Sequence, residues 1–348
     1  MTPQTPILAA AVLVAPLLSV LATRWLSARA GTRFGALDVP NARSLHSAPV
    51  PRTGGLAVLL GLALPLLALA VLGQVPGTLG WIALALVPVA VVAFVDDLGE
   101  VAPRWRLLAQ VLGALVLIAA GLRWGVVELP GVAWALPLVA SLPLTLLAVV
   151  WMTNLYNFMD GMDGLAASMT LFGFGALALL GWNGGEPGYA AVAGCVAGAG
   201  AGFLSGNFPP ARIFLGDVGS VSLGLLAAAL ALWGAQLGLF PLWVALLAFS
   251  PFVVDATWTL LARLARGERV WQAHRSHHYQ RLVLAGWSHR RTLLRAQLLM
   301  AAASACAVAA PGLVARDQWL VIGAWCAIYL LVHLKVGLVE RAAAGSRA

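Results

Sequence analysis

Long apolar runs that recur along the whole chain constrain its fold more than any other sequence feature. An α-helix needs about 20 mostly apolar residues to cross the hydrocarbon core of a bilayer. Runs of this kind lie at 6–23, 55–73, 79–95, 107–122, 134–152, 164–182, 189–206, 218–236, 239–262, 296–314 and 319–338. The sequence therefore predicts an all-α, polytopic membrane protein, a helical bundle with about eleven transmembrane helices.

The composition excludes a soluble protein. Of the 348 residues, 61% are hydrophobic and 10% are charged, whereas soluble domains are roughly 45–50% apolar and about 25% charged. The three cysteines lie in apolar runs, so a disulfide scaffold is also excluded. The polar stretches are too short for a separate soluble domain, and we expect residues 1–348 to form a single membrane-embedded domain.

The distribution of basic residues predicts the orientation in the membrane. No Lys or Arg precedes Arg24, so the first run lacks the basic start of a signal peptide. With the N-terminus outside, only Arg123 and Arg316 of the 21 basic residues would lie in outer loops, as the positive-inside rule requires. The net charge of +8 then reflects topology and contact with anionic membrane lipid, and nucleic acid is not an expected partner.

Acidic residues gather in the loops that this topology places in the cytoplasm. Asp96 and Asp97 end the third run, Asp160 and Asp163 follow the fifth, and Asp217 precedes the eighth. Carboxylates that meet at a membrane boundary repel one another, and a divalent cation would relieve the repulsion. Solvated helix caps would explain one such acid, but they do not explain three clusters on one face.

Amides and glycines accompany these acids. Asn154, Asn157 and Asp160 recur every three residues, so one helix face would present amide and carboxylate oxygens together. The glycine-rich turn around Asp217 precedes a helix, where backbone N–H groups can bind phosphate while the carboxylate reaches a metal; a plain N-cap is the alternative. Carboxylates for a metal and cations for phosphate are the groups that phosphoryl transfer requires.

The last polar loop holds His274, Arg275, His277 and His278. Three histidines in five residues would suit zinc, but no cysteine or acid lies close to them and Arg275 stands between them. A cluster that binds oxyanions is therefore the favoured interpretation.

In this order and spacing, the motifs resemble the polyprenyl-phosphate N-acetylhexosamine-1-phosphate transferase family, glycosyltransferase family 4. The resemblance runs from about Asp38 to His289 and rests on Arg43…His46…Pro51-Arg52-x-Gly54-Gly55, Asp96-Asp97, Asn154…Asn157…Asp160-Gly-x-Asp163-Gly164-Leu165, Gly216-Asp217-x-Gly219-Ser220, Pro251…Asp255…Arg263 and the histidine loop. Gln272-Ala273 departs from the family pattern, because many relatives have an Asp there.

The resemblance implies an enzyme of the bacterial inner membrane whose active site and C-terminus are cytoplasmic. Undecaprenyl phosphate would attack the β-phosphate of a UDP-N-acetylhexosamine in a reaction that depends on Mg²⁺, with Mn²⁺ as a second candidate metal, and UMP would leave. The stretch from His274 to Leu282 most resembles the branch that initiates O-antigen or capsule-type glycan assembly. A homodimer is a further expectation.

The resemblance also assigns roles to residues. Asp217 and Asn157 would hold the metal, Asp96 and Asp97 would serve the lipid phosphate as base or orienting groups, and Asp160 and Asp163 would shape the nucleotide pocket. Substrate would be bound by the remaining polar residues of the motifs, namely Arg43, His46, Arg52, Asn154, Arg212, His274, Arg275, His277 and His278. Direct in-line attack with Asp97 orienting the acceptor is favoured, and an aspartyl-phosphate route through Asp96 or Asp97 is the alternative.

A cation-coupled transporter is the main rival class. Transporters place ionisable groups near the middle of the membrane, whereas Asp255 is the one acid within an apolar run here. A structural membrane scaffold would give no reason for clustered acids.

Overall fold

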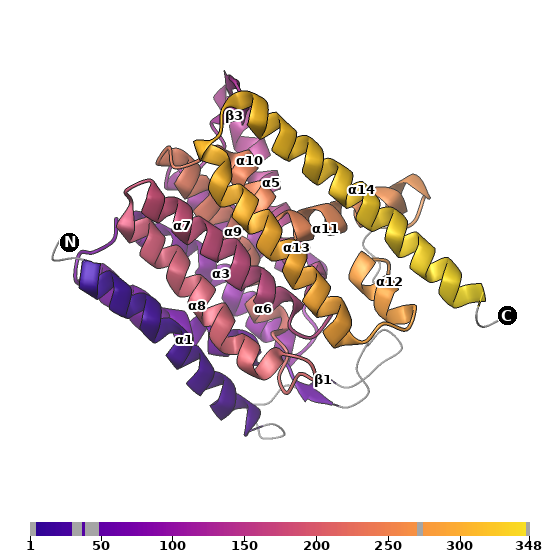
Figure 1. Cartoon of the computed structure of the whole chain (residues 1–348). Helices are drawn as coiled ribbons and strands as arrows, with labels where there is room; N and C mark the ends of the chain where they lie inside the picture. Colours follow the sequence, from indigo (N-terminus) through magenta and orange to yellow (C-terminus); the bar gives the residue numbers. More distant parts are fainter. Residues whose placement is uncertain (1–4, 30–36, 39–48, 270–273, 346–348) are drawn as a thin grey trace.

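The computed structural model describes residues 5–29, 37–38, 49–269 and 274–345, and they form a bundle of helices (Figure 1). The helices are α1 (Thr5–Ser27), α2 (Gly54–Val71), α3 (Thr78–Leu98), α4 (Pro103–Ala119), α5 (Leu138–Phe158), α6 (Leu165–Met169), η1 (Thr170–Phe174), α7 (Gly175–Asn183), α8 (Pro187–Asn207), α9 (Gly216–Gln236), α10 (Leu242–Ala248), α11 (Ser250–Ala265), α12 (His278–Leu284), α13 (His289–Ala309), η2 (Ala310–Gly312) and α14 (Ala315–Gly345). Two short antiparallel hairpins pair β1 (Leu37–Asp38) with β2 (Val50–Pro51) and β3 (Val126–Leu129) with β4 (Val132–Ala135).

The predicted polytopic helical fold is confirmed, but the count of about eleven spans is not. Among the described residues, nine spans are long and apolar enough to cross a membrane, with α6, η1 and α7 forming one of them. The count is ten if α10 and α11, which meet at 87°, make one span. The expected span at 107–122 corresponds to α4, which has 17 residues and begins Pro-Arg-Trp-Arg.

The bend between α10 and α11 has a local chemical cause. Pro251 has no backbone N–H, so it cannot donate to the carbonyl of Leu247 as a continuous helix would require. The Ser250 hydroxyl donates to that carbonyl instead, with an O···O distance of 2.6 Å. The backbone therefore turns sharply within an apolar segment, and the Leu247 carbonyl still has a hydrogen-bond partner.

Helix α9 is the most deeply buried span, and it packs against α2, α3 and α5. Its N-terminus lies against the start of α2, where Gly54 and Gly55 donate backbone hydrogen bonds to Phe214 and Leu215. A Cβ on Gly55 would collide with the backbone of Gly219, so glycine is required for this close approach. The ends of α3 and α5 thus meet the beginnings of α2 and α9 at one end of the bundle, hereafter the site end.

Candidate active site

Asp97 ties the end of α3 to the beginning of α9. One carboxylate oxygen accepts the backbone N–H of Asp217 at 3.0 Å, and the other accepts that of Val218 at 2.9 Å. These N–H groups belong to the first turn of α9, where backbone N–H groups have no acceptor within the helix and where the helix dipole has its positive end. Asp97 is only 4% exposed and therefore acts as an N-terminal cap that is supplied by another helix.

Asp217 lies directly beside this cap. Its Oδ1 accepts the side-chain amide of Asn157 at 2.9 Å, and the same amide reaches the hydroxyl of Ser220 at 2.9 Å. The carboxyl group of Asp96 lies within hydrogen-bonding reach of Asp217. The structure thus brings together both predicted metal-site residues and both members of the Asp96–Asp97 pair.

Two arginines offset part of this negative charge. The guanidinium of Arg106 lies 2.9 Å from Asp96 Oδ2 and 3.7 Å from Asp217 Oδ2, so it bridges the two carboxyl groups. Arg52 donates to the backbone carbonyl of Asp97 at 3.1 Å and lies 3.9 Å from its carboxylate. From the sequence, Arg106 counts among the cations on the same face as the acids, but it has no assigned role in the site.

Asp160 adds a further carboxyl group to the same region. Burial, together with the neighbouring charges of Asp217 and Asp97, raises the pKa of Asp160 well above its ordinary value. A divalent cation bound beside these carboxyl groups would relieve the repulsion among them.

The residues present fit a magnesium ion. The described residues include no group of three His, Cys, Asp or Glu side chains arranged to hold a metal by themselves. Magnesium does not need such a group, because it usually takes one or two carboxylates and completes its shell with water and substrate phosphate. Asp217 and Asn157 offer a carboxylate and an amide oxygen at the site end for such a shell.

A cavity of about 400 Å³ opens beside Asp217, between α3, α4, α5 and α9. Its polar lining consists of Arg106, Gln110, Asn154, Asn157 and Asp217. The side-chain amides of Gln110 and Asn154 bind each other reciprocally, with N···O distances of 2.6 and 3.3 Å. Arg106 and Gln110 are four residues apart on α4 and share a helix face, which is the sequence pattern that could have identified them.

The histidine segment is held by Asp255 of α11. The carboxylate of Asp255 accepts the backbone N–H of His278 at 3.0 Å and lies 3.1 Å from His278 Nδ1 and 3.4 Å from His277 Nδ1. On its other side, His278 Nε2 lies 3.0 Å from Nδ1 of His333 in α14. Asp255 is thus a partner of the histidines within the fold.

The histidine segment adjoins the acidic loop without lining the cavity described above. Tyr279 donates its hydroxyl proton to the carbonyl of Phe158 at 3.1 Å, which places the segment beside the end of α5. Burial, together with the charges of His277 and Arg263, lowers the pKa of His274 to about 4, so this imidazole is neutral at pH 7. Neutral His274 would therefore meet a phosphate as a hydrogen-bond donor and not as a cation.

Asp163 and Arg212 lie where loops meet. Asp163 accepts the backbone N–H of Ala211 at 3.0 Å and lies 3.3 Å from His289 Nδ1, so it joins the loop after α5 to the α8–α9 loop and to the start of α13. The exposed Arg212 donates to the carbonyl of Ser205 at 3.1 Å. Arg275 is exposed, and Arg43 and His46 lie outside the described residues.

Comparison with known proteins identifies the family of the chain. The family model described as Glycosyl transferase family 4 matches residues 79–235. A probable undecaprenyl-phosphate N-acetylglucosaminyl 1-phosphate transferase of Bacillus subtilis is 30% identical over 284 residues, which cover 81% of this chain and 79% of the relative. The chain belongs to glycosyl transferase family 4.

Other members of glycosyl transferase family 4 are similarly related. A decaprenyl-phosphate N-acetylglucosaminephosphotransferase of Mycolicibacterium smegmatis is 35% identical, over 81% of this chain and 77% of the relative. A phospho-N-acetylmuramoyl-pentapeptide-transferase of a Synechococcus strain is 36% identical, over 55% of this chain and 56% of the relative. Family membership and the helical bundle make the chain a multi-pass membrane transferase, and they do not favour the transporter alternative.

Proposed function

We propose that the chain transfers an N-acetylhexosamine 1-phosphate group from a UDP-N-acetylhexosamine to undecaprenyl phosphate and releases UMP. The observation that carries the proposal is the meeting of Asp96, Asn157 and Asp217 beside a cavity at one end of a membrane bundle. The named relatives, which act on undecaprenyl or decaprenyl phosphate, support the choice of a polyprenyl acceptor.

The proposed site faces the cytoplasm of the bacterial inner membrane, with the N-terminus outside. The clustering of basic residues in the loops at this end supports the orientation. Asp217 and Asn157 would hold Mg²⁺, or Mn²⁺ in its place, and the metal would supply neutralisation of the pyrophosphate charge. The resulting lipid diphosphate sugar would start an O-antigen or capsule-type glycan.

The chemical step is an in-line displacement at the β-phosphorus of the donor. The acceptor phosphate, with a second pKa of about 6, is largely dianionic at neutral pH, so its oxygen can form the new P–O bond without a strong base. The P–O bond to the bridging oxygen breaks, and UMP leaves with its electron pair. Arg106, which lines the cavity, would stabilise the charge on these oxygens, as cations do in phosphoryl transfer.

The surroundings of Asp97 support this direct route over an aspartyl-phosphate intermediate. Both of its oxygens accept backbone N–H groups, and the side chain is buried. A carboxylate engaged in this way positions α9, and with it Asp217, and is poorly placed to attack phosphorus.

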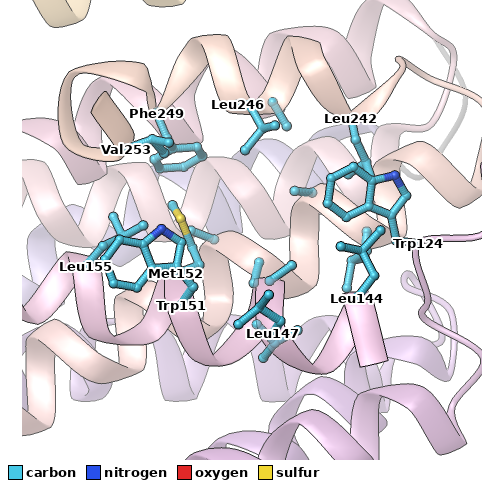
Figure 2. Close-up of a pocket in the computed structure, with 17 residues that line it drawn as sticks. Trp124, Leu144, Leu147, Trp151, Met152, Leu155, Leu242, Leu246, Phe249 and Val253 are labelled. Atoms are coloured by element: carbon cyan, nitrogen blue, oxygen red, sulfur yellow. The ribbon is translucent and has the colours of Figure 1, made fainter. Parts of the chain in front are cut away.

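An apolar groove of about 240 Å³ supports a polyprenyl acceptor (Figure 2). Trp151, Met152 and Leu155 of α5 face Phe249 and other residues around the α10–α11 bend across this groove. Its lining extends along α5 from Leu144 to Leu155, a length of about 16 Å at 1.5 Å per residue. Leu155 is two residues from Asn157, so the groove leads from the apolar interior toward the site end.

The proposal is tested by UMP release from purified protein with undecaprenyl phosphate and a panel of UDP-N-acetyl sugars. We expect chelation to abolish release, Mg²⁺ to restore it, and Asp217→Ala to lower turnover by about two to three orders of magnitude. Near-normal turnover of a well-folded Asp217→Ala protein would overturn the role of this residue. Uptake of a solute into vesicles without UMP formation would favour the transporter, and light scattering tests the predicted homodimer.

A further inference from the structure

A second cavity, of about 210 Å³, lies between α11, α12, α13 and α14. Its walls are mostly apolar and include Leu299 and Met300 of α13 opposite Val332 and Val336 of α14. Helix α14 packs mainly against α12 and η2, and most of its length lies on the outside of the bundle (Figure 1). The cavity is therefore located where membrane lipid borders the protein.

The cavity has a cationic mouth. Arg295 of α13 and Lys335 of α14 line it from opposite sides, and both residues are exposed. The Arg295 guanidinium lies 4.4 Å from the ring centroid of Trp287, another lining residue, and that of Arg291 lies 4.3 Å from the same ring. Trp287 thus holds two guanidinium groups close together at the mouth.

The acids near this mouth are already engaged. Asp255 contacts His277 and His278, and Glu340 forms two hydrogen bonds with Arg281. Within the described part of the chain, neither Arg295 nor Lys335 forms an ion pair with a carboxylate. The mouth therefore has a positive charge that an external anion would complement.

The interior of the cavity extends away from these cations between apolar side chains. Tyr329 also lines the cavity and lies six residues before Lys335, which is about 9 Å along α14. The Tyr329 hydroxyl forms a hydrogen bond with the Ser250 hydroxyl, with an O···O distance of 2.5 Å. A ligand that matches this space has an anionic group at one end and a hydrocarbon chain behind it.

We propose that this cavity binds an anionic phospholipid of the membrane. Its phosphate would lie between Arg295 and Lys335, and one acyl chain would enter between α13 and α14. Basic pockets between transmembrane helices are known to hold anionic headgroups in this way. Because Asp255 and His278 also line the cavity, the bound lipid would press against the residues that hold the histidine segment in place.

The test compares three forms of the full chain in nanodiscs of phosphatidylcholine with phosphatidylglycerol. The test variant carries Arg295→Gln and Lys335→Gln. The control carries Arg290→Gln and Arg341→Gln, which remove the same charge from exposed positions on the same two helices outside the cavity lining. Native mass spectrometry counts the phosphatidylglycerol retained after release from the nanodisc, without turnover, so the result is independent of the proposed reaction.

We expect the unmodified chain and the control to retain phosphatidylglycerol, and the test variant to retain it about thirtyfold more weakly, from about 1 kcal/mol for each basic residue near an anionic surface. Ala296→Trp, which fills the interior and keeps both cations, should weaken retention as well. Equal retention by test variant and control would overturn the proposal. So would equal retention of phosphatidylcholine, or displacement of phosphatidylglycerol by undecaprenyl phosphate.

Discussion

Replacement of Asp97 tests whether this carboxylate caps α9 or acts as a catalytic base. Asp97→Ala would leave the backbone N–H groups of Asp217 and Val218 without acceptors in a buried setting. Hydrogen bonds to a charged group contribute about 1.5–3 kcal/mol each, and the relief of repulsion with Asp160 and Asp217 offsets part of the loss. We expect a net destabilisation of about 2–4 kcal/mol for alanine.

Asparagine has one acceptor oxygen where aspartate has two, so Asp97→Asn should cost about half as much as alanine, about 1–2 kcal/mol. For a chain of this size, a change of 1 kcal/mol shifts the Tm by roughly 2 °C. The expected decreases in Tm are therefore about 4–8 °C for alanine and about 2–4 °C for asparagine. Glu100→Gln, at an exposed position just after the end of α3, is the matched control and should melt within about 1 °C of the unmodified chain.

The assay combines thermal melting in detergent with UMP release by the same samples. If Asp97 positions α9, Asp97→Asn should lose stability and keep measurable turnover, about tenfold reduced. The reasoning is refuted if Asp97→Asn melts like the unmodified chain and yet loses turnover by three orders of magnitude or more. That result would restore the role of base for Asp97.

Three further predictions concern other contacts. Burial raises the pKa of Asp163, but hydrogen bonds from His289 and Ala211 outweigh this effect and hold the pKa below its ordinary value. Asp163→Asn should therefore lower the Tm near neutral pH, and the difference in Tm should vanish as the pH falls below about 4. A difference in Tm that persists below this pH would contradict the linkage. Gln110→Leu should lower kcat/KM about tenfold with little change in Tm, because Asn154 loses its reciprocal amide partner; unchanged kinetics would make the pair purely structural. His333→Phe should lower kcat about fivefold through the lost contact with His278, and recovery of activity in His333→Gln would indicate that the hydrogen bond, and not ring packing, matters.

The sequence was sufficient to predict the fold class and the convergence of the acids. Bilayer thickness fixes the length of an apolar run, so the runs identify helices without any knowledge of their packing. Charge repulsion makes clusters such as Asp96-Asp97 costly unless something compensates them, which is why their positions were informative. Structure was needed to show that Asp97 serves the N-terminus of α9, because its partners lie about 120 positions further along the chain.

Other features depended on packing between distant segments. Nothing in the local pattern around Asp255 indicates that His277 and His278 would bind it. The break before α11 was foreseeable from Pro251, but the apolar composition of 239–262 concealed it. Gln110 was missed because it lies in an apolar run, and Arg106 was given no role because it falls in the loop just before that run, although both belong to α4.

The sharp bend between α10 and α11 has a consequence for the way in which a lipid substrate enters the protein. Residues on both sides of this bend line the apolar groove together with residues of α5. A polyprenyl chain in the bilayer would enter this groove laterally from the lipid, without passing through water. Ser250, whose hydroxyl binds the Leu247 carbonyl at the bend, thus helps to maintain a lateral entrance to the groove.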